Sequence, residues 1–248
     1  MPRWSRWLGS WEAQQQNLLP RREERFALIC AAVARHCGPE PRVLDLGSGP
    51  GSLAFRLVRS LPAARVLAID RDPVLLEIGR RALARRPQIQ FADRNLADPE
   101  LPELGASFDA AVSSTALHWL DRAALSTLYR SLAAMLRPGG LLVNADHLRE
   151  EGGVIGQLTR GLEGDLEVTQ RGHMAQGPRT WEGWWAEAEA APELAGPMAE
   201  RRRREHHHPA HQQPTSLEQH QQALREAGFA EVSSLWQYLG NRVLVAIR

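Results

Sequence analysis

A glycine-rich turn that begins with an acidic residue stands in the first quarter of the chain. Residues 45–51 read Asp-Leu-Gly-Ser-Gly-Pro-Gly and continue directly from an apolar run at 43–46. Glycines adopt backbone conformations that other residues avoid, and they let the chain approach a ligand closely. A helix that opens at such a turn presents free backbone amides at its first residues. The turn therefore predicts a small-molecule site at the end of a buried strand.

Two further acidic residues follow later apolar runs. Asp70 ends the second run, and Asp93 follows the third. A carboxylate at the first of these places can accept hydrogen bonds from both hydroxyls of a ribose. Asp93 is placed to accept a hydrogen bond from an adenine amino group. Together with the glycine turn, the two acids favour a ligand that has an adenosine part.

Two histidines stand near the expected ends of later strands. His118 follows the run that ends at Ser113, and His147 follows Asp146 at the end of the fifth run. Either histidine could accept a proton from a reacting group or orient it. His118 could instead pack against the adenosine side of the ligand, and His147 could simply hydrogen-bond to the segment that follows.

Tryptophans gather in two segments that are distant in the sequence. Large aromatic surfaces suit a flat or hydrophobic ligand, and they also suit a cation. The alternative is that they join covering helices to the sheet as core contacts, and Trp119 would also pack well over the adenosine ligand. The candidate substrate contacts are Trp7, Trp11, Trp119, Trp181 and Trp185.

Runs of histidine and arginine in the second half of the chain predict no metal site. No cysteine or carboxylate completes a familiar ligand spacing around His206–His208 and His211, which we interpret as part of a loop. Arg201–Arg204 is typical of a solvated helix face, although a phosphate- or carboxylate-binding function stays open. Cys30 and Cys37 are too few for a disulfide framework and are expected to be small packed residues.

Apolar runs and helix-like segments alternate through the middle of the chain. This alternation predicts a parallel sheet with right-handed crossovers. The expected strands are 43–46, 66–69, 89–91, 110–112 and 141–143, and the expected helices are 51–60, 73–85, 97–104 and 121–136.

The end of the chain predicts one more helix and an antiparallel hairpin. Thr215 and Glu218 have the spacing of a capping box, which predicts a helix that runs to Ala227 and ends at Gly228. Two strands at 229–236 and 242–247 follow, joined by a turn at Gly240-Asn241. The fold class is therefore α/β: a doubly wound, mostly parallel, seven-stranded Rossmann-like sheet with a terminal antiparallel hairpin and a helical cap insertion.

This pattern divides the chain into four parts. Amphipathic helices at 3–19 and 21–36 form an N-terminal lid, so the first part is 1–36. The remaining parts are a cofactor-binding core at 37–147, a mostly helical cap for the substrate at 148–214, and the completion of the core at 215–248.

Composition excludes several functional classes. The chain has 248 residues and a net charge of +1, so nothing in its charge demands nucleic acid or an anionic membrane. It contains no lysine, which excludes a lysine base or Schiff base. No apolar run is long enough to span a membrane, and the N-terminus does not resemble a secretory signal, so we expect a cytoplasmic protein.

Taken together, these motifs resemble those of the class I S-adenosylmethionine-dependent methyltransferases. The likeness continues at Phe108-Asp109, at Arg137-Pro-Gly-Gly140 and at Ala227-Gly-Phe229, and it covers 41–147 and 215–247. A nicotinamide-binding turn would read G-x-G-x-x-G, but here the third glycine comes one residue early and Pro50 intervenes. The resemblance implies that S-adenosyl-L-methionine is the cofactor and S-adenosyl-L-homocysteine the product. The residues that it implies for the cofactor are Asp45, Gly47, Ser48, Gly49, Gly51, Asp70, Arg71, Asp93, Arg94, Asn95 and Ser113.

The segment after the fourth strand bears on the acceptor. In this family it faces the transferred methyl group, and the branch that methylates amino groups of nucleic acids carries Asn/Asp-Pro-Pro-Tyr/Phe there. Residues 116–120, Ala-Leu-His-Trp-Leu, resemble instead the small-molecule, trans-aconitate-like branch. We therefore expect methyl transfer to an oxygen or nitrogen of a small organic molecule by a monomer or homodimer, with His118 and His147 as candidate catalytic residues. The alternatives are a cofactor-binding non-catalytic or regulatory protein and an RNA methyltransferase.

Overall fold

Seven strands form one sheet at the centre of the molecule. The computed structural model describes residues 3–19, 21–98, 101, 107–150, 152–174, 180–204 and 215–248. The strand order is β3-β2-β1-β4-β5-β7-β6. The strands are β1 Arg42–Leu46, β2 Arg65–Asp70, β3 Ile89–Asp93, β4 Phe108–Ser114, β5 Leu136–His147, β6 Glu231–Tyr238 and β7 Asn241–Ile247.

The sheet is parallel except at one edge. Strands β1 to β5 pair in parallel, whereas β7 lies antiparallel to both β5 and β6. Strands β1, β2 and β4 have their carboxyl ends at the same edge of the sheet. The chain runs outward from β1 to β3 in one direction and from β4 to β5 in the other, so the direction changes between β1 and β4. A ligand site is expected at such a point in an open α/β sheet. The predicted fold class of the sheet is confirmed.

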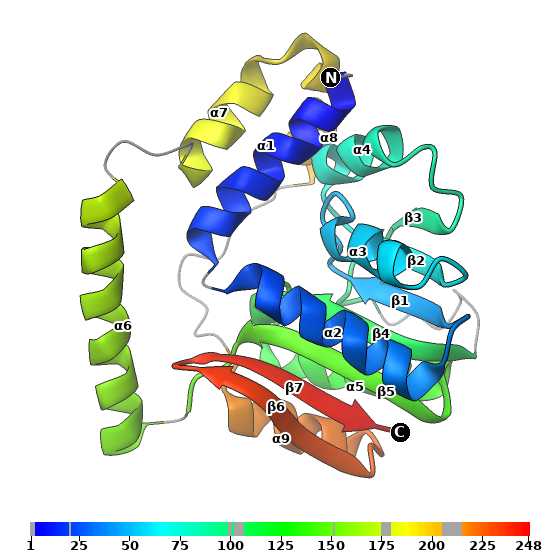
Figure 1. The fold of residues 1–248 in the computed structure, drawn as a ribbon, viewed down its shortest axis with the longest axis vertical. Helices are drawn as coiled ribbons and strands as arrows, with labels where there is room; N and C mark the ends of the chain where they lie inside the picture. The colour runs from blue at the N-terminus through cyan, green and yellow to red at the C-terminus, as the bar shows by residue number, and fades with distance from the viewer. Residues whose placement is uncertain are drawn as a thin grey trace.

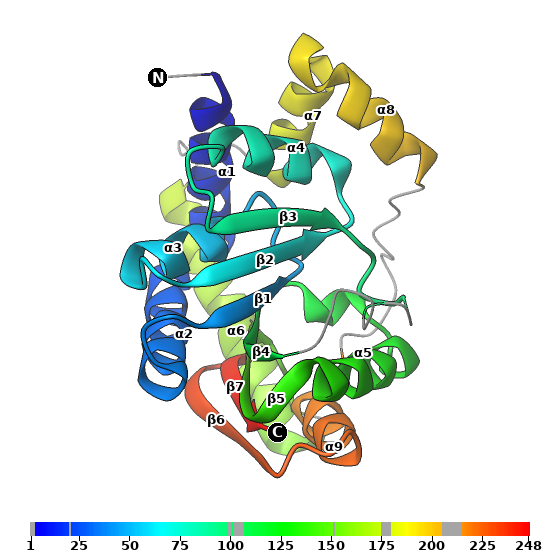
Figure 2. The same ribbon diagram turned by 90° about the vertical axis from the view of Figure 1, so that its right-hand side faces the viewer.

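Helices cover both faces of the sheet (Figures 1 and 2). On one face α2 and α3 enclose an apolar core that includes Ile29, Leu57 and Val112. On the other face α5 and α9 enclose a second core around Leu128, Leu132 and Leu224. The helices are α1 Arg3–Leu18, α2 Arg22–Cys37, α3 Ser52–Ser60, α4 Pro73–Ala82, α5 Arg122–Met135, α6 Gly153–Met174, α7 Trp181–Ala190, α8 Ala195–Arg203 and α9 Leu217–Glu226.

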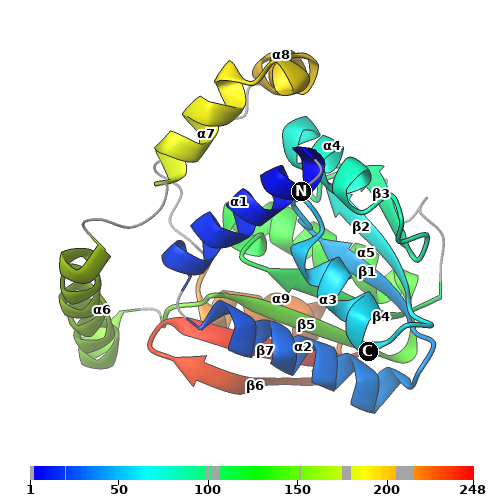
Figure 3. The same cartoon turned by 45° about the horizontal axis from the view of Figure 1, so that its top comes forward.

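A third apolar cluster lies away from the sheet. Trp7 and Trp11 of α1 pack there with Trp184 of α7, with Met198 of α8 and with one face of α4. Figure 3 shows α7 and α8 on the same side of the molecule as α1 and α4, whereas α6 stands at the margin. Helix α1 therefore meets α7, and α4 meets α8, in a layer above the core.

Three local predictions need correction. The capping box of α9 is formed by Ser216 and Gln219, because the hydroxyl of Thr215 instead contacts the buried ring of His220. The hairpin turn lies at residues 239–240, and Asn241 already belongs to β7. Strand β5 begins at Leu136 rather than near 141. The chain end extends it, since the Gly139 amide donates to the Arg248 carbonyl.

The helix expected at 97–104 falls mostly outside the described residues. Among the residues that are described, 96–97 form a turn. The free cysteines agree with the prediction that they are packing residues: Cys30 is buried and Cys37 is half-buried.

Candidate active site

A cavity of about 520 Å³ opens at the carboxyl ends of β1, β2 and β4. Its floor is the glycine turn after β1. Its walls come from the ends of β2 and β4, from the N-terminal helices and from α7 and α8. This volume is within the usual range for a small-molecule site.

The glycine turn keeps the backbone close to its neighbours. Gly47, Gly49 and Gly51 all have positive φ, which side-chain-bearing residues rarely adopt. A Cβ on Gly47 would collide with Ala116, and one on Gly51 would lie 2.8 Å from the ring of Phe91. Gly47, Ser48 and Gly49 line the cavity, whereas Gly51 packs beneath the turn instead of facing the ligand space.

Burial destabilises the ionised forms of two carboxyl groups that line the cavity. Asp45 is buried and accepts one hydrogen bond, from the Ala54 amide at 3.1 Å. Burial raises its pKa to about 7. Burial also raises the pKa of Asp70 to about 6, although that carboxylate accepts hydrogen bonds from the amides of Gly49 and Asp72 at 2.7 and 2.8 Å. A cationic ligand group near Asp45 would stabilise its ionised form.

The predicted adenine end of the site is only partly as expected. Arg71, Arg94 and Asn95 line the cavity. Asp93 does not line it, because its two carboxylate oxygens pair with Arg204 at 2.8 and 2.7 Å. Ser113 is also absent from the wall, because its buried hydroxyl donates to the carbonyl of Leu46 at 3.0 Å.

His118 lies on the cavity wall and is held by a buried carboxylate. Its Nδ1 is 2.7 Å from Asp146 Oδ1, and its backbone amide donates to Asp146 Oδ2 at 3.1 Å. The His147 amide also donates to Asp146 Oδ1 at 2.8 Å, and the side chain of Asp146 is fully buried.

The electrostatics of this pair determine which ring nitrogen of His118 carries the proton when the ring is neutral. Burial alone would raise the pKa of Asp146, but His118 and the hydrogen bonds lower it to about 2. Burial alone would lower the pKa of His118, but the charge and the hydrogen bond of Asp146 raise it. Because Asp146 is a carboxylate, Nδ1 of His118 must donate to it. In the neutral ring Nε2 is then the proton acceptor.

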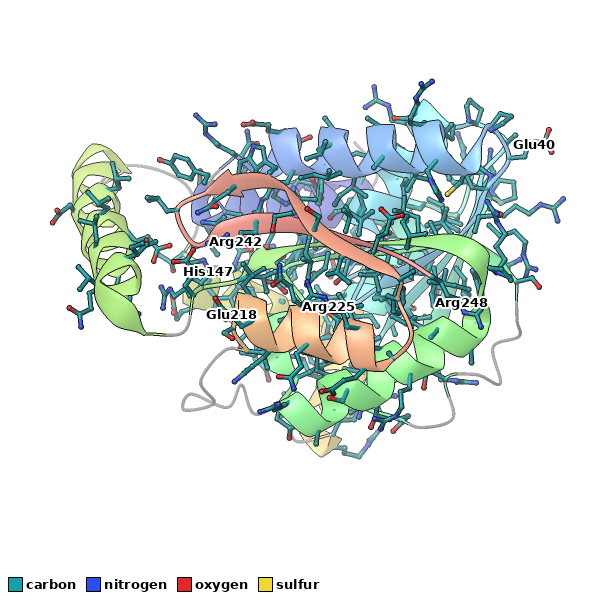
Figure 4. The ribbon with its side chains drawn as sticks, turned by 90° about the horizontal axis from the view of Figure 1, so that it is seen from below. Glu40, His147, Glu218, Arg225, Arg242 and Arg248 are labelled. Atoms are coloured by element: carbon teal, nitrogen blue, oxygen red, sulfur yellow. The ribbon has the colours of Figure 1, made fainter. Side chains whose placement is uncertain are left out.

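His147 lies elsewhere. It does not line the cavity, and its Nε2 is 3.8 Å from Glu163 Oε1 of α6. Figure 4 shows it at the end of β5, close to Arg242 of β7. Burial and the nearby charge of Arg149 lower its pKa. The structure thus differs from the expectation for His147: it points away from the cavity that His118 lines, because successive residues of a strand point to opposite faces.

The tryptophans divide between the cavity and the apolar cluster above it. Trp11, Trp119, Trp181 and Trp185 line the cavity. Trp7 does not, because it packs against Trp184 with the ring centroids 5.7 Å apart, and its indole donates to Glu193. Most of these rings also contact one another, so they join α1 to α7 as well as lining the wall.

Two residues at the site are absent from the candidate site residues predicted from the sequence, although one of them, Arg201, belongs to the arginine run for which carboxylate binding stayed open. Asp146 was noted only as the neighbour of His147, yet the period of two along β5 places it beside Asn144 on one face, away from Val143 and Ala145. That alternation of polar and apolar residues could have indicated that Asp146 faces away from the apolar core around Val143 and Ala145. Arg201 lines the cavity from α8, and no sequence pattern links it to Asp72, with which it pairs at 2.8 Å.

The described part of the chain holds no group of three or more residues that could bind a metal ion. The histidine run 206–208 and His211 lie outside the described residues. Within the same ranges, no helix combines the length and the apolarity needed to cross a membrane.

Known proteins share this sequence pattern. Residues 43–140 match the family described as "Methyltransferase domain". The trans-aconitate 2-methyltransferase of Methylobacterium nodulans is 31% identical over 193 residues, which are 76% of this chain and 69% of that enzyme. The chain belongs to the class I S-adenosylmethionine-dependent methyltransferases.

Other methyltransferases agree with this assignment. A malonyl-[acyl-carrier protein] O-methyltransferase of Hahella chejuensis is 33% identical over 64% of this chain and 54% of its own length. The chain spans about half the length of several curated relatives that it matches. A putative O-methyltransferase from Nostoc punctiforme superposes with a TM-score of 0.58 at 15% identity, covering 99% of this chain and 60% of that one, and it shows the same fold.

Membership of this methyltransferase family confirms the resemblance identified in the sequence and the cofactor, S-adenosylmethionine. The residues present fit that cofactor. Asp45 offers a buried carboxyl group that needs a cation, and Asp70 stands above a turn that leaves no room for side chains at Gly47 and Gly51.

Proposed function

We propose that this chain transfers a methyl group from S-adenosylmethionine to an ionisable oxygen or nitrogen of a small organic acceptor, with His118 as the residue that accepts the acceptor's proton. The observation that carries the proposal is that His118 lies on the wall of the same cavity as Asp45 and Asp70 and is held from behind by the buried carboxylate of Asp146.

The cofactor end of the cavity is defined by the glycine turn. Asp45 would hold the amino group of the methionine part, and Asp70 would accept the ribose hydroxyls. Both carboxyl groups have raised pKa values, so a cation and two hydroxyl donors would relieve the cost of burying them. Gly49 has no side chain, so the ligand could approach its backbone closely. The ring of Trp11 lies next to this glycine.

The acceptor would lie between His118 and the N-terminal helices. This part of the wall is mostly apolar, with Leu18, Phe26, Trp119 and Leu120. Trp119 is 43% exposed, so an apolar acceptor would cover a ring that water now contacts.

One charged group also lines the acceptor region. Arg22 is held there by a hydrogen bond of 2.8 Å to Glu12, and a second arginine, Arg56, pairs with the same carboxylate. Burial opposes the charge of Glu12, but Arg22, the hydroxyl of Ser52 and Arg56 together lower its pKa to about 2. This network fixes α1 against α2 and α3, and so fixes the wall that the acceptor would touch.

In this arrangement the cofactor and the protein would contribute different parts of the reaction. The sulfonium of the bound cofactor supplies an activated methyl group. The chain's own residues position the acceptor and exclude water. Asp146 holds Nδ1 of His118, and Nε2 takes the proton that the acceptor loses as the new bond forms.

The test is a comparison of acceptor classes in the wild type and the His118→Gln variant. A phenol keeps its proton at neutral pH, whereas a carboxylic acid such as trans-aconitate has already lost it. If His118 is the base, the variant should lose about 100-fold or more in kcat with a phenol that the wild type methylates. Its loss with a carboxylate substrate should be much smaller. The formation of S-adenosylhomocysteine measures both.

The controls separate chemistry from binding. His36 is an exposed histidine near the end of α2 that does not line the cavity, and its Nε2 contacts the Gly139 carbonyl, so His36→Gln should leave turnover unchanged. The affinity of His118→Gln for S-adenosylhomocysteine should also be unchanged. Full turnover of phenols by His118→Gln would refute the role of the base. Cofactor binding without turnover of any acceptor would favour a non-catalytic protein.

A further inference from the structure

The basic end of α8 reaches the acidic residues at the adenosine end of the site. Arg204 donates from Nη1 and Nη2 to the two oxygens of Asp93, and its Nη1 also donates to the Arg71 carbonyl at 2.9 Å. One turn earlier, Arg201 donates to Asp72 at 2.8 Å and lies over the ring of Trp185. In Figure 2, α8 ends near the carboxyl end of β3.

The Arg204–Asp93 contact uses the hydrogen-bonding edge of the carboxylate. A bidentate guanidinium pair places one N–H on each oxygen in the plane of the carboxylate. An adenine amino group that approached the same edge would meet the arginine. Asp93 is therefore engaged by the chain itself in this structure.

We propose that Arg204 competes with the cofactor for Asp93, so that it weakens cofactor binding until it is displaced. The proposal rests on the proposed function, in which Asp93 accepts a hydrogen bond from the adenine amino group. In the cofactor-free protein Arg204 holds Asp93, and in the complex the adenine amino group replaces it.

The packing of α8 allows Arg204 to move while the helix stays in place. Leu194 and Met198 are buried in the apolar cluster with Leu75 and Ile78 of α4. Arg204, by contrast, follows the last residue of α8 and is partly exposed. Loss of its contact with Asp93 leaves the apolar attachment and the Arg201–Asp72 pair intact.

The size of the competition follows from the exposure of the pair. The side chains of Arg204 and Asp93 are 30% and 37% exposed. Ion pairs in such positions contribute up to about 1 kcal/mol, which corresponds to about fivefold in a dissociation constant. Removal of the arginine should thus tighten cofactor binding by about that factor.

The chain offers a matched control on the same helix. Arg203 also pairs with Glu200, but it reaches no residue of the cavity among the described residues, and its side chain is 72% exposed. Calorimetric titration of the full chain with S-adenosylhomocysteine compares the wild type, Arg204→Gln and Arg203→Gln. We expect binding to tighten about fivefold in Arg204→Gln and to stay unchanged in Arg203→Gln.

The Asp93→Asn background shows whether the effect passes through Asp93. Asp93→Asn should weaken binding, and Arg204→Gln added to it should have no further effect. Salt provides a second measurement without a variant: screening the ion pair should raise the affinity of the wild type relative to Arg204→Gln.

The outcomes are distinct. Unchanged or weaker binding in Arg204→Gln, with normal binding by the wild type, would overturn the competition and make Arg204 a support or a cofactor ligand. The failure of the wild type to bind S-adenosylhomocysteine at all would instead overturn the proposed function.

Discussion

The buried acids of the site have opposite electrostatic states. Asp45 and Asp70 have pKa values raised to about 7 and about 6, because burial outweighs the hydrogen bonds that they accept. Asp146 is equally buried, yet its pKa falls to about 2, because His118 and backbone amides stabilise its charge. Among the described residues, the ionised forms of Asp45 and Asp70 thus have no cationic side chain to offset burial, whereas that of Asp146 is stabilised by His118.

The Asp146–His118 pair leads us to expect a specific pH dependence of kcat. Asp146 raises the pKa of His118, and only the neutral ring can accept a proton, so activity should rise with pH through a value above 6.5. Asp146→Asn should move this acid limb to lower pH and reduce kcat by about tenfold or more, because the neutral amide no longer favours the charged ring or fixes its tautomer. The pH profile of kcat measures both effects.

The control for this prediction is Asp121→Asn, since Asp121 caps α5 and asparagine serves equally well as a cap. An acid limb that stays in place in Asp146→Asn would contradict the assignment of His118 as the base.

The same pair links stability to pH. Asp146 contributes stability that is lost as the pH falls from about 4 towards 2, and His118 contributes stability below pH 6.5 that is lost as the pH rises through its folded-state pKa.

Asp45 makes a prediction about cofactor binding. With a pKa near 7, a sizeable fraction of Asp45 is protonated at pH 6.5, and the ammonium group of S-adenosylhomocysteine should drive its ionisation. Binding at this pH should therefore release protons. Titration in buffers of different ionisation enthalpy measures the number released, and Asp45→Asn should reduce it. Equal release by both proteins would show that the protons come from another group.

At the scale of elements, the sequence predicts the strands and most helices of the core but not which residues of the covering helices contact one another. The alternation of apolar runs predicted β1 to β5, and the tryptophan spacing predicted α1. The spacing could not show that Trp7 and Trp11 would find Trp184, since that contact joins segments far apart in the chain. The Arg204–Asp93 pair escaped prediction for the same reason.

The aromatic cluster makes a prediction about stability. Trp184 is fully buried, and its indole donates to Ser10 of α1 at 3.0 Å. Trp184→Ala should cost about 3–5 kcal/mol in the free energy of unfolding, or locally detach α1 and α7 from α4. Thermal unfolding and limited proteolysis distinguish these two forms of the effect.

Trp119→Ala is the matched comparison, because its ring is 43% exposed and it should change stability by about 0.5 kcal/mol or less. Equal losses in the two variants would show that the cluster does not hold the covering helices.

At the scale of the molecule, the glycine turn and the strand order together place the cavity at the carboxyl ends of β1, β2 and β4. The sequence motifs could predict most of the residues at the proposed cofactor end of the cavity, because these residues directly follow successive strands. The proposed acceptor end lies between α1, α2, α7 and the segment after β4, which together line the cavity. Its composition depends on how distant helices pack, which local patterns do not encode.

The most direct test of the account is a calorimetric titration with S-adenosylmethionine and S-adenosylhomocysteine, with NAD as the control. The account predicts dissociation constants on the order of micromolar for the first two, no binding of NAD, and a loss of about tenfold or more in Asp70→Ala. Binding of NAD alone, or unchanged affinity in Asp70→Ala, would contradict it.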